Sequence, residues 1–178
     1  MSSSIVRWSV LGVAAAAALA AGIYFAYDAR TAKPESEPLA AAALNGLALP
    51  DVDGKEQRLD QWRGKLIVVN FWATWCAPCR EEMPEFIKAQ SELGPKGLQF
   101  VGIAVDQPDK VKQFAEEIGL NYPTLVGGFG AMELSKTLGN HLMALPFSVV
   151  MDRKGTIVYT QLGTLKPDKL TAITRQYL

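Results

Sequence analysis

Apolar and polar residues follow one another along this chain in blocks that predict strands and helices in alternation. Two nearly unbroken apolar runs rich in β-branched residues, at 65–72 (KLIVVNFW) and 98–106 (LQFVGIAVD), indicate strands that are covered on both faces. Each run is followed by a segment with helical spacing of its apolar residues, at 80–94 and at 109–119. This alternation predicts neighbouring strands with helices packed on their sheet.

The remaining segments predict two hairpins and a closing helix. The turn sequence Asp51–Gly54 divides an apolar stretch and predicts an N-terminal β-hairpin, and Asp152–Gly155 predicts a second one. Between them we expect a short strand near 122–126 and a helix near 131–138, and Pro167 opens a final helix. Strands that first alternate with helices and then pair as a hairpin predict an α/β fold with a mixed central sheet flanked by helices.

The chain opens on an uncharged apolar segment. Residues 8–27, with aromatic side chains at both ends, would span roughly 30 Å as a helix, which matches a bilayer core. This predicts a membrane anchor or uncleaved signal over 1–27, although small residues at 18–20 leave a cleaved signal peptide open. A linker over 28–43, rich in proline, charge and alanine, then leads to a folded domain over 44–178 outside the cytoplasm.

Composition and charge exclude two classes of protein. Hydrophobic residues make up 49% of the chain and charged residues 20%, so the sequence can bury a core and does not resemble a disordered protein. The formal net charge is zero, so the basic footprint of a nucleic-acid-binding protein is absent. We therefore expect no nucleic-acid partner.

The only two cysteines of the chain, Cys76 and Cys79, stand two residues apart where the first predicted strand passes into a helix. The free N–H groups and positive dipole end of a helix stabilise a thiolate, which is the reactive form of cysteine. This spacing lets the first sulfur attack a disulfide while the second resolves the mixed disulfide that results. The pair therefore predicts thiol–disulfide exchange.

Other uses of a cysteine pair fit less well. A zinc site needs about four ligands, and beyond the cysteines the chain offers only a distant His141. Covalent haem attachment requires a histidine at the position that Arg80 occupies. A structural disulfide across so short a loop removes little chain entropy. We therefore expect redox chemistry that uses no metal and no cofactor.

The segment NFWATWCAPCREEMP (70–84), followed by LPFSVVMDRKG (145–155), resembles the active-site region of membrane-anchored thioredoxin-like reductases of the TlpA/ResA type. The resemblance covers roughly residues 44–178. It implies a thioredoxin-like fold and a protein-disulfide reductase, a thiol:disulfide oxidoreductase. It also implies a single-pass protein of the inner (cytoplasmic) membrane, with its catalytic domain in the periplasm or outside the cell. Members of this family reduce exported proteins, notably apocytochrome c, with electrons from a transmembrane thiol carrier.

Carried over to this chain, the resemblance makes Cys76 the nucleophile and Cys79 the resolving thiol. Trp75 would flank the site. Pro146 matches the cis-proline that faces the dithiol in thioredoxin-like proteins, and a cis X-Pro bond is uncommon enough to indicate a purpose. It would expose the backbone of Leu145 for pairing with an extended substrate.

The chain departs from thioredoxin at Asn70, which stands where thioredoxin itself usually has a buried aspartate that handles the proton of the resolving thiol. Asparagine cannot titrate, so Glu82 is our candidate for that role, because it follows Cys79 by three residues on the same helix face. A solvated helix glutamate is the alternative, and we expect this for Glu81. Phe147 replaces a small hydroxylated residue of relatives, so the shape of the substrate groove stays open.

These observations predict a membrane-tethered reductase of disulfides in exported proteins. Three alternatives stay open at this point. The dithiol could oxidise folding proteins, or reduce a disulfide during copper-centre assembly. The chain could also be a binding or chaperone module that uses the groove at Leu145 and Pro146, with the dithiol incidental.

Overall fold

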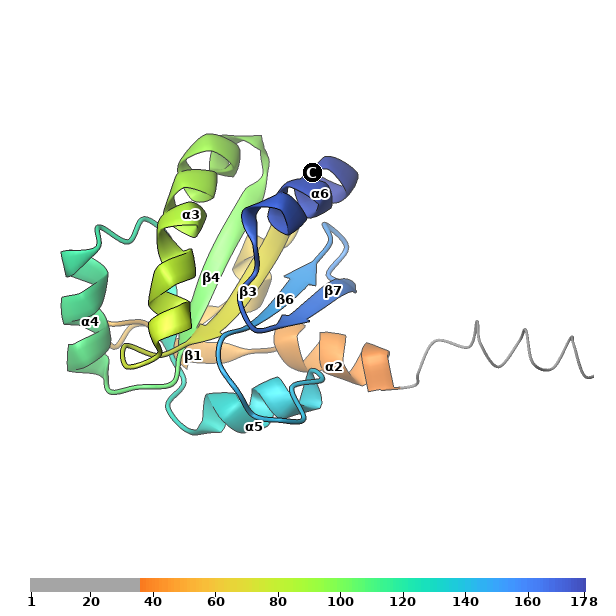
Figure 1. The fold of residues 1–178 in the computed structure, drawn as a ribbon. Coiled ribbons are helices and arrows are strands. Elements are labelled where there is room, and N and C mark those ends of the chain that lie inside the picture. Colours follow the sequence, from red (N-terminus) through yellow and green to blue (C-terminus); the bar gives the residue numbers. More distant parts are fainter. Residues whose placement is uncertain (1–35) are drawn as a thin grey trace, which may run out of the picture. The chain divides into compact units, whose positions relative to one another are not determined.

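Five strands form one mixed sheet in the order β5-β4-β3-β6-β7 (Figure 1), in a computed structural model that describes residues 36–178. Strands β3, β4 and β5 are parallel, whereas β6 is antiparallel to both β3 and β7. The strands are β3 Leu66–Trp72, β4 Leu98–Ala104, β5 Thr124–Val126, β6 Phe147–Met151 and β7 Ile157–Leu162. The predicted mixed sheet and its C-terminal hairpin are confirmed.

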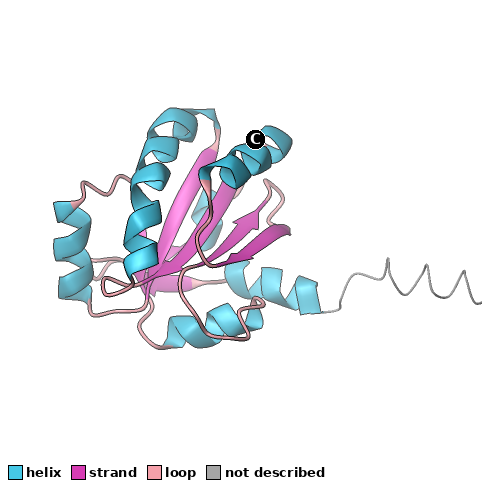
Figure 2. Ribbon diagram, in the orientation of Figure 1, coloured by secondary structure: helices cyan, strands magenta, loops and turns pink. Residues whose placement is uncertain are grey.

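Helices cover both faces of this sheet (Figure 2). They are α2 Ser36–Asn45, α3 Ala77–Leu93, α4 Pro108–Glu117, α5 Gly130–Thr137 and α6 Pro167–Tyr177. A separate N-terminal hairpin, as predicted, pairs β1 Ala48–Pro50 with β2 Glu56–Arg58. Two short 3₁₀ helices, Leu59–Trp62 and Gly94–Lys96, complete the described elements.

Strand β3 runs through the middle of the sheet and separates two apolar cores. Its residues Ile67, Val69 and Phe71 pack into the core that lies under α2 and α5. Leu66 and Val68 point the other way, into the core under α3 and α6. Because side chains alternate along a strand, Asn70 shares this second face, and α3 begins just beyond the end of β3. This placement brings the start of α3 against the sheet.

One part of the chain differs from its expected structure. Residues 36–43 were expected to belong to a linker, but they lie in helix α2, and Ala40 and Leu44 of that helix are buried in the core. The run of alanines there is a strong helix former, and packing on the sheet stabilises a helix too short to be stable alone. The predicted anchor at 1–27 lies outside the described residues. Within 36–178, no helix combines the length and apolar character that crossing a membrane requires.

Candidate active site

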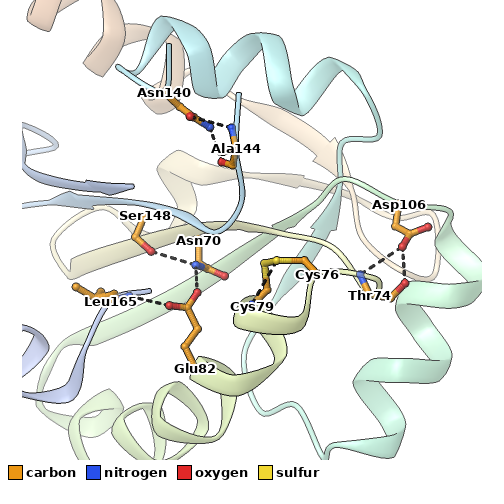
Figure 3. The surroundings of a disulfide bond; sticks show 10 residues. All are labelled: Asn70, Thr74, Cys76, Cys79, Glu82, Asp106, Asn140, Ala144, Ser148 and Leu165. Carbon is orange, nitrogen blue, oxygen red and sulfur yellow. Dashed lines mark hydrogen bonds between the residues drawn. A yellow bond between two sulfur atoms is a disulfide. The ribbon is translucent and has the colours of Figure 1, made fainter. Parts of the chain in front are cut away.

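The two cysteines lie where β3 passes into α3, and they form a disulfide (Figure 3). Cys76 is the N-cap of α3, and its Sγ accepts a hydrogen bond from the backbone N–H of Cys79 at 3.3 Å. Pro78 sits in the first turn, where a missing N–H leaves no helical hydrogen bond unmade. Cys76 is 5% exposed and Cys79 is fully buried, so the first sulfur is the one that a partner can reach.

The loop before the disulfide is fixed to the neighbouring strand. Thr74 donates hydrogen bonds from its backbone N–H and its hydroxyl to the carboxylate of Asp106, which follows β4 (Figure 3). Partial burial raises the pKa of Asp106, but the hydrogen bonds from Thr74 and from the Gln107 N–H outweigh it, so the pKa is lowered overall. The carboxylate therefore stays charged and holds the loop that carries Trp75 and Cys76.

A buried polar network lies one helical turn beyond Cys79 (Figure 3). The side-chain amide of Asn70 donates to Glu82 Oε1 at 2.9 Å and to the hydroxyl of Ser148 at 3.0 Å. The backbone N–H of Leu165 donates to the other oxygen of Glu82 at 2.8 Å. Glu82 is only 3% exposed, so it is not the solvated helix glutamate that was the alternative.

Burial raises the pKa of Glu82 to about 7, although the hydrogen bonds from Leu165 and Asn70 act in the opposite direction. A carboxyl group with a pKa near neutrality exchanges its proton readily at physiological pH. It lies on the same face of α3 as Cys79, one turn away. The structure therefore places a buried carboxyl group with a pKa near 7 one helical turn from Cys79.

The peptide bond between Leu145 and Pro146 is cis, as predicted. Leu145 is partly buried and packs against the apolar cluster that contains both cysteines, so this loop lies beside the disulfide. The loop is held by Asn140, which is fully buried and exchanges two hydrogen bonds with the backbone of Ala144, at 2.9 and 3.1 Å (Figure 3). Sequence reasoning missed Asn140, because an isolated asparagine in a polar loop carries no signal.

Next to Trp75 there is an apolar hollow of about 450 Å³. Trp75 is 68% exposed and Phe129 is 90% exposed, and both line this hollow together with Val105 and Val126. Phe129 belongs to the Gly-rich turn that precedes α5, which showed no functional signal in the sequence. The structure thus brings together two exposed aromatic residues that are more than fifty positions apart in the chain.

Other singled-out residues lie away from the disulfide chemistry. Glu81 and His141 are exposed on the surface. Phe147 is 2% exposed, and its ring packs against that of Phe71 with the centroids 5.9 Å apart. This ring points into the core under α2 and α5, so Phe147 does not shape a groove at the surface.

Comparison with known proteins agrees with this geometry. Residues 29–176 match the Redoxin family. The thiol-disulfide oxidoreductase ResA of Bacillus cereus is 30% identical over 145 residues, which are 81% of this chain and 81% of that protein. The thioredoxin-like protein YneN of Bacillus subtilis is 33% identical over 122 residues, covering 66% of this chain and 68% of the relative.

Solved structures show the same fold. A thiol:disulfide interchange protein of the thioredoxin family from Chlorobium tepidum superposes with a TM-score of 0.67 and 29% identity, over 74% of this chain and 92% of the other. The predicted thioredoxin-like fold is therefore confirmed. With its Cys76–Cys79 pair at disulfide distance, the chain belongs to the Redoxin family and is a thiol-disulfide oxidoreductase of the TlpA/ResA type.

Proposed function

We propose that this protein works as a reductase of protein disulfides, and that the buried carboxyl group of Glu82 sets this direction. A strong oxidant of this fold has a reduced form that is stabilised as a thiolate. A carboxylate near the two cysteines raises thiol pKa values and so opposes the stabilised thiolate of the nucleophile Cys76 that a strong oxidant needs. The burial of Glu82 beside Cys79 is the observation that carries the proposal.

The reaction follows from the exposure of the two sulfurs. The thiolate of reduced Cys76 attacks a substrate disulfide, which forms a bond between the two proteins and releases one substrate thiolate. Cys79 then loses its proton to Glu82 and attacks the Cys76 sulfur, which releases the second substrate thiolate and closes the Cys76–Cys79 disulfide. Two electrons pass to the substrate, and a membrane thiol carrier that supplies two electrons and two protons restores the dithiol.

The substrate and location that we propose come from the family resemblance and from the uncharged segment at 8–27. This segment would hold the protein in the inner membrane with the catalytic domain in the periplasm or outside the cell. Disulfides of exported proteins, apocytochrome c among them, would then be the substrates. A protein of copper-centre assembly presents the same chemistry, and trapping of the mixed disulfide distinguishes the two.

The reduction potential tests the direction of the reaction. The position of Cys76 at the N-terminus of α3 stabilises its thiolate, and this feature alone would favour a dithiol oxidase. We expect Glu82 to outweigh it, so the potential should lie near roughly −270 mV, as in thioredoxin, and not near roughly −120 mV, as in the oxidase DsbA. Equilibration with dithiothreitol or glutathione buffers measures it, and a value near the second figure would make the protein an oxidase.

We further propose that the hollow between Trp75 and Phe129 receives an apolar side chain of the substrate. Trp75 directly precedes Cys76 and lines this hollow, so a substrate bound at Cys76 would lie close to it. Burial of one apolar side chain contributes about 1.5–3 kcal/mol. Phe129→Ser should therefore raise the KM for a peptide disulfide with an aromatic neighbour by about tenfold with kcat unchanged. Stopped-flow exchange kinetics measure both constants.

The controls for this prediction use a second substrate and a second surface. Glutathione disulfide has no apolar side chain, so its KM should be the same for the Phe129→Ser and wild-type proteins. Leu39 on α2 is also exposed, at 75%, and Leu39→Ser should leave the peptide KM unchanged. An equal rise in KM for both substrates would contradict the proposed role of the hollow.

A further inference from the structure

The side-chain oxygen of Asn70 is buried and accepts no hydrogen bond from the residues that the structure describes. Both hydrogens of the amide group are engaged, one by Glu82 and one by Ser148. This orientation of the amide is the one that an ionised Glu82 requires, because a carboxylate can only accept hydrogen bonds. Asn70 is 1% exposed, and its Oδ1 has no hydrogen-bond partner among residues 36–178. An unpaired buried acceptor is unfavourable, and most buried polar groups have a hydrogen-bond partner, so this oxygen calls for an explanation.

The free oxygen of Asn70 is directed toward the cysteines. Asn70 lies on the face of β3 that α3 covers, and its amide nitrogen contacts Glu82, one turn along α3 from Cys79. Figure 3 shows the carbonyl end of the amide pointing to the disulfide, on the side away from Ser148. Cys79 is fully buried, so solvent does not reach its sulfur. In the disulfide this sulfur has no hydrogen to donate.

We propose that Asn70 is a positioning residue whose Oδ1 accepts a hydrogen bond from the thiol of reduced Cys79. When a donor dithiol reduces the protein, the bond between the two sulfurs breaks, and Cys79 leaves with the electron pair and takes up a proton. The new S–H then has a buried acceptor in front of it. The amide is fully paired only in this reduced resting state, and its hydrogen bond to the thiol must break before the proton of Cys79 passes to Glu82.

This hydrogen bond would favour the protonated thiol over the thiolate, because a carbonyl oxygen stabilises an S–H and repels a negative sulfur. Among residues 36–178, Cys76 shares the apolar cluster of Cys79, Glu82 lies one turn along the same helix, and the charge of Glu82 also acts on Tyr122. Burial, with a contribution from the charge of Glu82, raises the pKa of Tyr122, so its hydroxyl stays neutral in the range where thiols titrate. Ser148, on the strand that packs against Asn70, carries no charge.

The S–H stretching band of Cys79 in the infrared tests the inference directly. The chain has two cysteines, so in a Cys76→Ala variant of the full protein Cys79 is the only thiol. We expect its band at the lower wavenumber of a hydrogen-bonded thiol. Adding Asn70→Leu should move the band to the position of a free thiol. It should also raise the acid dissociation constant of Cys79 about fivefold, the change expected from losing the net free energy of one hydrogen bond.

Two further variants separate this contact from a general effect on packing. Ser148→Ala removes the other partner of the amide but leaves the oxygen in place, so the band should not move. Asn70→Asp keeps an acceptor and should retain the hydrogen-bonded band. If Asn70→Leu does not fold, the Cys76→Ala protein decides alone, because a free-thiol band in that protein would overturn the inference.

The inference rests on the dithiol cycle proposed above but not on its direction. The infrared measurement needs no substrate and no electron donor. A failure of the hydrogen bond would therefore appear with exchange activity intact, whereas a failure of the proposed reductase function would appear in the reduction potential with the band unchanged.

Discussion

A Cys79→Ser variant is expected to lose at least about a thousandfold of its steady-state disulfide-reducing activity and to accumulate as a mixed disulfide with its substrate. Attack by a resolving thiol held beside the Cys76 sulfur benefits from effective concentrations of about 10⁵ M, which millimolar thiol in solution cannot replace. The Cα atoms of the two cysteines lie 5.3 Å apart, so Cys79 is held within reach throughout the reaction. The first step should survive because Cys76 keeps its place at the helix N-terminus.

Non-reducing electrophoresis and mass spectrometry of the trapped complex measure this result and identify the partner protein. Cys76→Ser is the matched control, because it changes the same atom in the other cysteine and should trap nothing. Equal trapping by both variants would show that the buried Cys79 can act as the nucleophile, which would contradict the assignment of roles. The identity of the trapped protein decides between an apocytochrome and a copper-assembly protein.

The second large effect concerns pH, because Glu82 should make the oxidised protein less stable as the pH rises. In the fold the pKa of Glu82 is raised to about 7 by burial, against a value of 4.5 for an unperturbed glutamate. Between these values the folded state holds a proton that the unfolded chain has released. The stabilising contribution of the Glu82 proton is thus fully present below about pH 4.5 and is lost as the pH rises through about 7. Between these two values the free energy of unfolding falls by about 1.4 kcal/mol for each pH unit.

The free energy of unfolding should therefore fall by about 2.5 kcal/mol between pH 5 and 8, and Glu82→Gln should remove most of this fall. Urea unfolding of the oxidised protein at a series of pH values measures the slope, with the disulfide intact so that no thiol titrates. Glu81→Gln makes the same change of charge on the exposed face of α3 and should keep the wild-type slope. A Glu82→Gln protein with an unchanged slope would show that this carboxyl group is not a buried acid.

Much of the fold could be predicted from local pattern. The apolar runs that became β3 and β4 are long and rich in β-branched residues, and the turns at Asp51–Gly54 and Asp152–Gly155 gave both hairpins. Helix α2 could not be predicted in this way. Its alanines show little amphipathic pattern, and what stabilises it is the burial of Ala40 and Leu44 against a sheet formed much later in the chain.

In the active site, too, the local features could be predicted and the contacts between distant residues could not. The cysteine pair at a strand-to-helix junction already predicted thiol–disulfide exchange, because the chemistry depends on spacing and on the helix N-terminus, which are local features. The contribution of Phe129 to the hollow beside Trp75 could not be predicted from the sequence, since a phenylalanine between glycines suggests only a turn. It became a candidate when the fold placed it beside Trp75.

By itself, then, the sequence determined the order of strands and helices and the presence of a two-electron dithiol, because both follow from neighbours within a few residues. Only the tertiary structure decided what surrounds that dithiol. Burial raises the pKa of Glu82 to about 7, while the hydrogen bonds from the Leu165 backbone and from Asn70, which lie on other parts of the fold, act in the opposite direction. Desolvation and hydrogen bonding depend on everything that packs around a group, and no short segment carries that information.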